Sequence, residues 1–160
     1  MSFEPVYGPA SRVLILGSWP SPESWRQGFY YGHPRNRFWP LLARLCGAET
    51  PQTVGQKRAL ILQNGLALWD VLESCTVTGA SDASIKDPVP VDLAALLKAA
   101  PIRAVLCNGA TAWRLYEALL RPVSGIAAVR LPSTSPANAA WSMDRLAAAW
   151  GEALGPWLDD

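Results

Sequence analysis

The fold is decided by an apolar run, Val13-Leu-Ile-Leu16, and by the long segment that follows it, Gly17-Ser-Trp-Pro-Ser-Pro-Glu-Ser-Trp-Arg-Gln-Gly-Phe-Tyr-Tyr-Gly-His-Pro-Arg-Asn36-Arg-Phe-Trp39. The run is too short for a helix and predicts a buried strand over residues 12–17, closed by Gly17. The segment after it combines aromatic rings, arginines, amides and turn-forming residues. A connection of this length is uncommon in a compact domain unless it binds a ligand. We therefore expect a binding loop at the carboxyl end of the first strand.

Strand and helix patterns alternate along the rest of the chain. The apolar periodicity predicts strands over 12–17, 66–72, 103–108 and 127–131, and helices over 37–46, 54–63, 91–100, from 109 onward and over 139–154. The polar stretch 73–90 predicts an irregular loop. Strands that alternate with helices favour a parallel sheet covered on both faces. The predicted fold class is therefore α/β, a three-layer α/β/α sandwich around a central, mainly parallel four-stranded sheet, in a single domain over residues 1–160.

The composition narrows the class of protein. With 160 residues, half of them hydrophobic, the chain is long enough to bury one core. Its apolar runs are far shorter than a bilayer span, and the N-terminus lacks a basic region followed by an apolar segment, so we expect a cytoplasmic protein without membrane contact. The net charge of +1 decides nothing about nucleic acid. Arg26, Arg35 and Arg37 in the long segment predict either a small positive patch or a solvated loop with scattered arginines.

The cysteines and the single histidine argue against a metal site. Cys46, Cys75 and Cys107 are odd in number and lie in apolar surroundings, which favours buried thiols in a reducing compartment. His33 is the only histidine, and there is no Cys-x-x-Cys or His-x-x-x-His pair. Phosphate-loop, dinucleotide-binding and nucleophile-elbow motifs are absent as well. A nucleotide hydrolase, a dinucleotide dehydrogenase and a serine hydrolase all lose support.

Three loops, 17–36, 73–90 and 131–138, are expected to meet above the carboxyl edge of the sheet. They carry, in this order, Gly17-Ser-Trp-Pro-Ser21 with Tyr30-Tyr-Gly-His-Pro-Arg-Asn-Arg-Phe-Trp39, then Leu68-Trp-Asp-Val-Leu-Glu-Ser-Cys75 with Gly79-Ala-Ser-Asp-Ala-Ser-Ile85, then Leu131-Pro-Ser-Thr-Ser-Pro-Ala-Asn138. In these blocks the chain resembles the hypoxanthine (deoxyinosine) DNA glycosylase branch of the uracil-DNA glycosylase superfamily. The likeness runs through nearly the whole chain.

The resemblance implies a DNA glycosylase of base-excision repair. Such an enzyme flips a deaminated base, here hypoxanthine in deoxyinosine, out of double- or single-stranded DNA and hydrolyses its N-glycosidic bond without metal or cofactor. No lysine lies in the three loops apart from Lys86 at the edge of one, so the enzyme is expected to be monofunctional, without lyase activity. We also expect a monomer.

The resemblance also points to catalytic residues. Most of the superfamily holds the attacking water with an Asp or Asn before the proline of the first block, where this chain has Trp19. The branch implies Asn36 instead, whose carbonyl oxygen would orient a water toward the sugar carbon. Asn36 also precedes a predicted helix, so it could cap that helix, and the two roles are compatible. His33 is the second catalytic candidate, as a donor to the leaving base, with ordering of its own loop as the alternative.

Residues near the predicted strand ends form a candidate pocket for the flipped base. Tyr30 and Tyr31 could stack on the base, although one of them is expected in the core. The Asp70 carboxylate could accept an N–H of the base edge or order its loop. Where the superfamily often has a histidine that serves a leaving pyrimidine, this chain has Leu131, which argues against efficient uracil removal. The predicted pocket set is Gly17, Ser18, Trp19, Tyr30, Tyr31, Asp70 and Asn108, the last with a turn role as its alternative.

The last block offers contacts to the DNA backbone. Its hydroxyls and backbone N–H groups suit phosphate, or else they cap the predicted closing helix. The tip at 136–138 is compact enough to enter the base stack as a wedge when the base leaves. The predicted DNA-binding set is Ser21, Arg35, Arg37, Ser133, Thr134, Ser135, Pro136, Ala137 and Asn138.

Three other functions stay open on this sequence. A mismatch-type uracil or xanthine glycosylase would use the same fold. Trp19, in place of the usual acid or amide, also fits a lesion-binding module with weak or lost catalysis. A hydrolase of free nucleosides would act without DNA and would have no use for the tip at 131–138.

Overall fold

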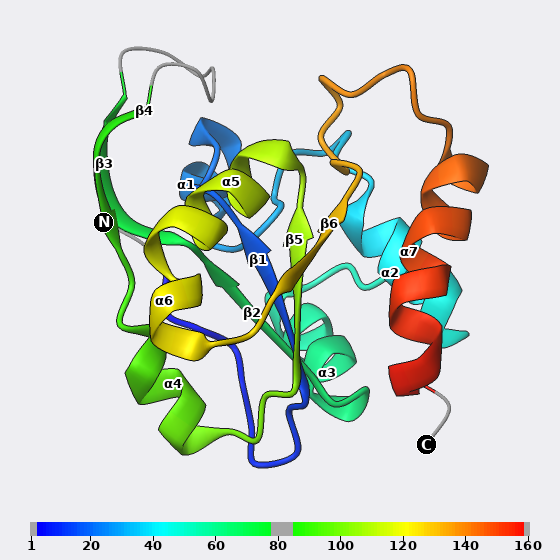
Figure 1. Cartoon of the computed structure of the whole chain (residues 1–160). Coiled ribbons are helices and arrows are strands. Elements are labelled where there is room, and N and C mark those ends of the chain that lie inside the picture. Colours follow the sequence, from blue (N-terminus) through cyan, green and yellow to red (C-terminus); the bar gives the residue numbers. More distant parts are fainter. Residues whose placement is uncertain (1–2, 78–84, 159–160) are drawn as a thin grey trace.

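The structure is a computed structural model that describes residues 3–77 and 85–158 (Figure 1). Its centre is a four-stranded sheet in the order β2-β1-β5-β6, in which all neighbouring strands run parallel. The strands are β1 (Val13–Gly17), β2 (Leu66–Asp70), β5 (Ala104–Asn108) and β6 (Ala128–Leu131). The predicted α/β fold around a central parallel sheet is thus confirmed.

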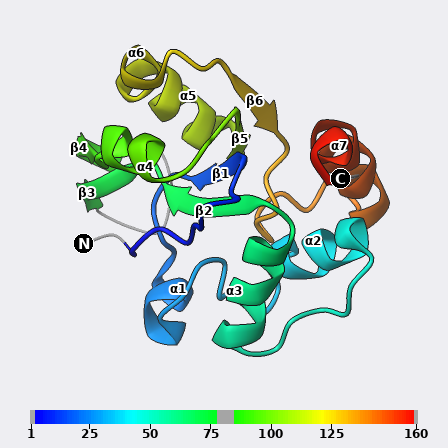
Figure 2. The ribbon, with the colours of Figure 1, turned by 90° about the horizontal axis from the view of Figure 1, so that it is seen from below.

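Helices cover both faces of the sheet and complete the three layers (Figure 2). One face carries α1 (Pro22–Gln27), α2 (Phe38–Cys46), α3 (Val54–Gln63) and α7 (Met143–Leu158), and the other carries α4 (Leu93–Ala99), α5 (Ala110–Leu119) and α6 (Arg121–Ser124). Helix α2 packs against α7, and α5 packs against β5 and β6. Among the described residues, no helix has the length and apolar character that a membrane span requires.

Burial on both faces explains the sequence of the strands. Every residue of β1 and β2 is buried, so these strands are continuous apolar runs rather than alternating ones. Helix α7 turns Leu146, Trp150 and Leu154 inward, as its spacing predicts. The Trp150 indole N–H also donates to the Pro132 carbonyl oxygen at 2.9 Å. This bond ties α7 to the start of the loop after β6.

The topology places a crevice at one edge of the sheet. The chain leaves β1 toward α1–α3 and leaves β5 toward α5, on opposite faces. In open α/β sheets, ligands bind at the carboxyl ends of two such strands. That edge is the upper one in Figure 1, where the connections that follow β1 and β6 lie close together.

The stretch 73–90 differs from the irregular loop that the sequence predicts. The strands β3 (Leu72–Val77) and β4 (Ile85–Pro90) pair antiparallel as a separate two-stranded sheet. Pro88 and Pro90 lack a backbone N–H, and they are tolerated because β4 pairs on one side only. The polar residues expected in this loop, Ser81, Asp82 and Ser84, lie outside the described residues.

The long segment after β1 contains a helix that was not predicted. Helix α1 follows Ser21, whose side chain accepts the Ser24 N–H at 3.1 Å, and it has Pro22 in its first turn. It ends at Gly28, whose φ of +74° favours glycine. These are ordinary start and stop signals of a helix, so the sequence carried the information.

The closing helix begins later than predicted, at Met143 instead of Ala139. The Trp141 N–H donates to the Asn138 carbonyl oxygen at 3.2 Å and keeps this stretch in a turn. Ser133, Thr134 and Ser135 are therefore too far from α7 to cap it, and that alternative is wrong.

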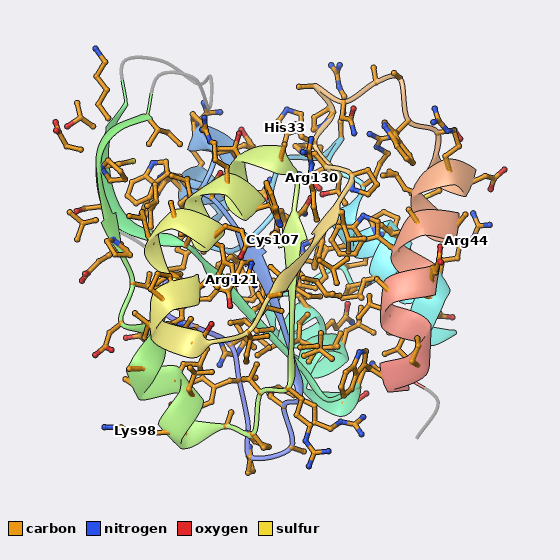
Figure 3. All side chains as sticks on the ribbon, in the orientation of Figure 1. His33, Arg44, Lys98, Cys107, Arg121 and Arg130 are labelled. Atoms are coloured by element: carbon orange, nitrogen blue, oxygen red, sulfur yellow. The ribbon has the colours of Figure 1, made fainter. Side chains whose placement is uncertain are left out.

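The cysteines follow the prediction in part. Cys107 is buried in β5, near the centre of the molecule in Figure 3, whereas Cys46 and Cys75 are half-buried, and all three thiols are free. Burial, together with the charge of Glu117, raises the pKa of Cys107 to about 12. The thiol that best fits the prediction is thus also the least reactive.

Candidate active site

A cavity of about 940 Å³ opens at the carboxyl edge of the central sheet. Gly17, Asp70 and Asn108 end β1, β2 and β5 and line this cavity, and Ser133, Thr134 and Ser135 enter it from the loop after β6. All four central strands therefore contribute to one cavity, as the predicted convergence of loops requires. From the 73–90 stretch, Ile85 at the start of β4 takes part.

One side of the cavity, which we call the floor, consists of Gly17, Tyr31 and Asp70. A Cβ atom at position 17 would lie 2.5 Å from Asp70 Oδ1 and 3.0 Å from Tyr31 Oη, so the site requires glycine. Asp70 Oδ2 and the Tyr31 hydroxyl are buried and have no hydrogen-bond partner of good geometry among the described residues. Buried polar groups are nearly always paired in folded proteins. The floor thus holds two buried polar groups without a well-formed hydrogen bond, and burial raises the pKa of Tyr31 although its contact with the Asn108 side chain opposes that rise in part.

Tyr31 is held in an unusual conformation. Its φ of +53° lies in the left-handed region, which is uncommon for a residue other than glycine. Its ring stacks on Phe38, with ring centroids 4.1 Å apart, and this contact fixes the ring over the start of α2. Backbone strain of this kind gathers at functional sites.

Burial changes the ionisation of the floor. It raises the pKa of Asp70 from 3.8 to about 7. Burial, and then the charge of Asp70, also raise the pKa of Tyr31 and that of Tyr30. Near neutral pH the tyrosines are therefore neutral hydrogen-bond donors, whereas Asp70 is present as both acid and carboxylate.

A second group of cavity residues, which we call the wall, consists of Asn36, Asn108 and Thr134. The Thr134 N–H donates to Asn108 Oδ1 and the Thr134 hydroxyl accepts from Asn108 Nδ2, both at 3.0 Å. The same hydroxyl donates to Asn36 Oδ1 at 2.8 Å. Thr134, at the centre of this network, is buried, whereas Asn36 and Asn108 are half-buried. The network joins the end of β5, the loop after β6 and the start of α2.

Asn36 is not the N-cap of α2, which is Arg37, but its side chain still pairs the first N–H of that helix. Its Oδ1 accepts the N–H of Phe38, the first residue of α2, at 3.0 Å. With the bond from Thr134, this oxygen accepts two hydrogen bonds from the protein. The carbonyl that was expected to orient a water is therefore already occupied, although Asn36 does line the cavity.

Arg37, predicted to bind DNA, is used inside the protein. Its guanidinium donates to the carbonyl oxygens of Ser135 at 3.2 Å, of Asn138 at 3.0 Å and of Trp141. Its backbone N–H donates to the Thr134 carbonyl oxygen at 3.1 Å. Arg37 thus sets the shape of the loop after β6, whereas Arg35 is exposed.

The loop after β6 is further ordered by its own side chains. Ser133 Oγ accepts from the Ser135 N–H at 3.1 Å, and Ser135 Oγ accepts from the Ala137 N–H at 3.2 Å. Asn138 Nδ2 donates to the Ser133 carbonyl oxygen at 3.0 Å. The exposed residue of this turn is Ala137, which also reaches the cavity.

Aromatic rings line the cavity on the side of α1. The ring of Trp25 lies 4.9 Å from that of Phe3 and 5.9 Å from that of Trp19, centroid to centroid. Tyr30 is buried and its hydroxyl donates to the Glu4 carbonyl oxygen at 2.8 Å, so it is the core tyrosine of the pair. Phe3, Trp25 and Ile85 were missed by the sequence analysis. The start and stop signals of α1 could have placed Trp25.

His33 does not line the cavity. Its Nδ1 accepts the Arg35 N–H at 3.0 Å, which is the loop-ordering alternative, and its side chain lies in the upper part of the molecule in Figure 3. The predicted residues that line the cavity are Gly17, Ser18, Trp19, Ser21, Tyr30, Tyr31, Asn36, Asp70, Asn108, Ser133, Thr134, Ser135 and Ala137, and those that do not are His33, Arg35, Arg37, Pro136 and Asn138. Within residues 3–77 and 85–158, no cluster of three or more His, Cys, Asp or Glu residues is placed to hold a metal ion.

A comparison with known families identifies the family of the chain. The model of the uracil DNA glycosylase superfamily matches residues 4–154. The chain therefore belongs to the uracil DNA glycosylase superfamily.

Within the superfamily, two curated relatives are named hypoxanthine DNA glycosylase. The one from Methanosarcina acetivorans is 37% identical over 145 residues, which are 89% of this chain and 90% of the relative. The one from Methanosarcina barkeri is 37% identical over 154 residues, which are 95% and 96% of the two chains. A solution NMR structure of a candidate uracil DNA glycosylase from Methanosarcina acetivorans matches with a TM-score of 0.84 and 34% identity, over 99% of this chain and 98% of that one.

Proposed function

We propose that this protein is a monofunctional DNA glycosylase that releases hypoxanthine from deoxyinosine in DNA. The observation that carries the proposal is the floor, where a buried carboxyl and a buried hydroxyl without well-formed hydrogen bonds belong to residues that line a large cavity. The family and the names of the two curated relatives support the same reaction. No lysine is among the described residues that line the cavity, which supports hydrolysis without a lyase step.

The floor has the chemistry to recognise hypoxanthine. The six-membered ring of this base presents an N1–H donor beside the O6 acceptor. The Asp70 carboxylate can accept the N1–H, and the neutral Tyr31 hydroxyl can donate to O6. Adenine presents the reverse order, an amino donor at C6 and an acceptor at N1, so its N1 is mismatched with the Asp70 carboxylate, whereas the Tyr31 hydroxyl could still accept from its amino group. The pair therefore favours the deaminated base over its parent.

The reaction needs few protein groups. The C1′–N9 bond breaks and its electron pair goes to the base, a water oxygen bonds to C1′, and a proton of that water ends on the base through solvent. The sugar passes through an oxocarbenium-like state, so a weak nucleophile is sufficient. Asn36 is the wall residue that we propose takes part in catalysis, because it lines the cavity and is fixed from two sides.

DNA is proposed to lie over the cavity mouth, with the protein acting as a monomer. The compact turn at Pro136, Ala137 and Asn138 is the candidate wedge, and Arg37 keeps its shape. Arg35 and the Ser133 and Ser135 segment are the candidate phosphate contacts. Compact residues at a rigid tip suit insertion into a base stack.

The test is to incubate the protein with duplexes that carry one hypoxanthine, uracil or xanthine, and to detect abasic sites by cleavage with alkali. We expect cleavage of the hypoxanthine strand only after alkali, because a lyase would nick it without treatment. Faster release of uracil or xanthine would assign the protein to the mismatch-type alternative. Binding without abasic sites would favour a lesion-binding module, and turnover of free deoxyinosine would favour a nucleoside hydrolase.

A further inference from the structure

Two backbone N–H groups fix the direction of every hydrogen bond in the wall. The Thr134 N–H donates to Asn108 Oδ1, so the Asn108 amide turns its NH₂ group to Thr134 Oγ1, 3.0 Å away. The Thr134 hydroxyl, which accepts this bond, donates its own hydrogen bond to Asn36 Oδ1. The Phe38 N–H donates to the same oxygen. Because a backbone N–H cannot accept, neither amide can be turned over without losing hydrogen bonds.

This arrangement decides which end of Asn36 can meet a ligand. A carbonyl oxygen has two lone pairs, and Asn36 Oδ1 already accepts two protein hydrogen bonds. The amide nitrogen Nδ2 has no acceptor among the described residues, and the side chain lines the cavity. The polar group that Asn36 has left for a ligand is therefore an N–H donor.

We propose that Asn36 acts on the substrate as a hydrogen-bond donor through Nδ2, and that Thr134, held by Asn108, is the residue that positions it. The proposal rests on the proposed glycosylase function and gives Asn36 a polarity opposite to that of a water-orienting carbonyl. The acceptor is the flipped purine, which takes the electron pair of the breaking C1′–N9 bond. A donor fixed in advance toward growing negative charge lowers the barrier of such a step.

The Asn36→Asp variant keeps the size of the side chain and its ability to accept hydrogen bonds, but it removes the N–H donor. One carboxylate oxygen still accepts from the Phe38 N–H and the Thr134 hydroxyl, so the melting temperature is expected to stay close to that of the wild type. The other oxygen replaces Nδ2 and has no proton to donate. Near neutral pH we expect hypoxanthine excision at least about 100-fold slower than in the wild type and as slow as in Asn36→Ala. An Asp variant that keeps most of the wild-type rate overturns the donor role.

The pH dependence of the Asn36→Asp rate is a second test. A donor role and an acceptor role of residue 36 predict opposite changes of this rate in acid. As the pH falls toward the ordinary carboxyl pKa of about 3.9, residue 36 becomes a carboxylic acid whose O–H can donate. The ratio of variant to wild-type rate is then expected to rise. Asp70, Tyr31, His33, Arg35 and Arg37 are the titratable or charged groups around this site, and the ratio cancels them because both proteins have them. A ratio that falls in acid assigns acceptance to residue 36 and overturns the proposal.

Thr134 is tested by a matched pair of variants. Thr134→Val removes the hydroxyl at nearly the same shape, and Thr134→Ser keeps it. We expect kcat to fall about tenfold in the valine variant with KM for the DNA almost unchanged, and the serine variant to recover most of kcat. A serine variant as slow as the valine variant, or a loss confined to KM, overturns the positioning role.

The failure of this inference is distinguishable from failure of the proposed function. If the wild-type protein forms no abasic site in any damaged duplex, both the proposed function and the donor role of Asn36 are wrong. If the wild type and the Asn36→Asp variant are both active near neutral pH, only the donor role is wrong.

Discussion

The floor and the wall of one cavity treat buried polar groups in opposite ways. In the wall, Thr134 uses its N–H, its carbonyl oxygen and its hydroxyl, and both amides are fixed by it. In the floor, Asp70 Oδ2 and the Tyr31 hydroxyl have no partner of good geometry within the described residues. An unpaired buried polar group costs about 1–3 kcal/mol. The side chains of the wall are therefore held in one geometry by hydrogen bonds. The floor retains an unfavourable free energy that a ligand can remove by pairing its polar groups.

Breaking the wall at Asn36 is expected to have the largest effect. Asn36→Ala removes the donor in the cavity and leaves the Thr134 hydroxyl and the Phe38 N–H without their acceptor. Single-turnover excision of hypoxanthine should fall by about 100- to 1,000-fold, the usual loss when one fixed donor is removed. Asn64→Ala, which removes a side-chain bond to the Leu60 carbonyl far from the cavity, should keep the wild-type rate. Equal rates for the two variants would contradict the account.

The ionisation of the floor predicts a dependence of stability on pH. The folded pKa of Asp70, about 7, lies above its ordinary value of 3.8. The folded state thus holds a proton that the unfolded state releases, so the stability from this group is complete below pH 4 and is lost as the pH rises through 7. Linkage gives a loss of about 3 kcal/mol between these limits.

Asp70→Asn tests this loss directly, because it removes the titration and keeps the volume. Urea unfolding at several pH values should show the wild type losing stability relative to the variant as the pH rises. Parallel curves for the two proteins would mean that Asp70 is not a strained buried acid. In the excision assay the wild-type rate should rise with pH through about 7, since the carboxylate is the form that accepts N1–H.

Filling the floor at Gly17 is expected to have a smaller effect. The new Cβ of Gly17→Ala would lie 2.5 Å from Asp70 Oδ1 and 3.0 Å from Tyr31 Oη, so one or both must shift. Excision should fall by about tenfold or more, because misplaced binding groups cost that much. Gly155→Ala in α7 has nothing within 4 Å of its new Cβ and should leave the rate unchanged. A Gly17→Ala variant as active as this control would show that the floor is not used.

Tyr31→Phe should give the smallest effect and the clearest contrast. It removes a buried hydroxyl that has no good partner, so stability should stay equal or rise by about 1 kcal/mol while excision falls severalfold. Tyr116→Phe is the matched control, because its hydroxyl lies 2.6 Å from both Ser124 Oγ and the Ile126 carbonyl oxygen. That variant should lose stability and keep the excision rate. The reverse result would exchange the roles of the two tyrosines.

The sequence predicted what local patterns determine. The four central strands follow from apolar runs closed by turn residues, and Gly17, Asp70 and Asn108 could be placed at one edge because parallel strands end together. The β3 and β4 pair was not predicted, because Pro88 and Pro90 are unfavourable in a strand unless one edge is free. Helix α1 was not predicted either, although Ser21 and Gly28 mark its ends.

The parts of the site that could not be predicted depend on contacts between distant residues. Thr134 meets Asn36 across 98 positions and Asn108 across 26, and nothing in the local sequence pairs them. The inward turn of Arg37 has the same cause, because its carbonyl partners lie on a loop about one hundred positions away. Residue type alone indicated a DNA contact for this arginine, whereas the structure uses it to order the loop that we propose enters DNA.

The most direct test is the release of free base from a duplex with a single deoxyinosine, measured by chromatography under single-turnover conditions. The wild-type protein is expected to liberate hypoxanthine and to leave an intact strand with an alkali-sensitive site. The Asn36→Ala variant is expected to bind the duplex and to release almost no hypoxanthine. Binding with no base released by the wild type, or equal release by both proteins, would contradict this expectation.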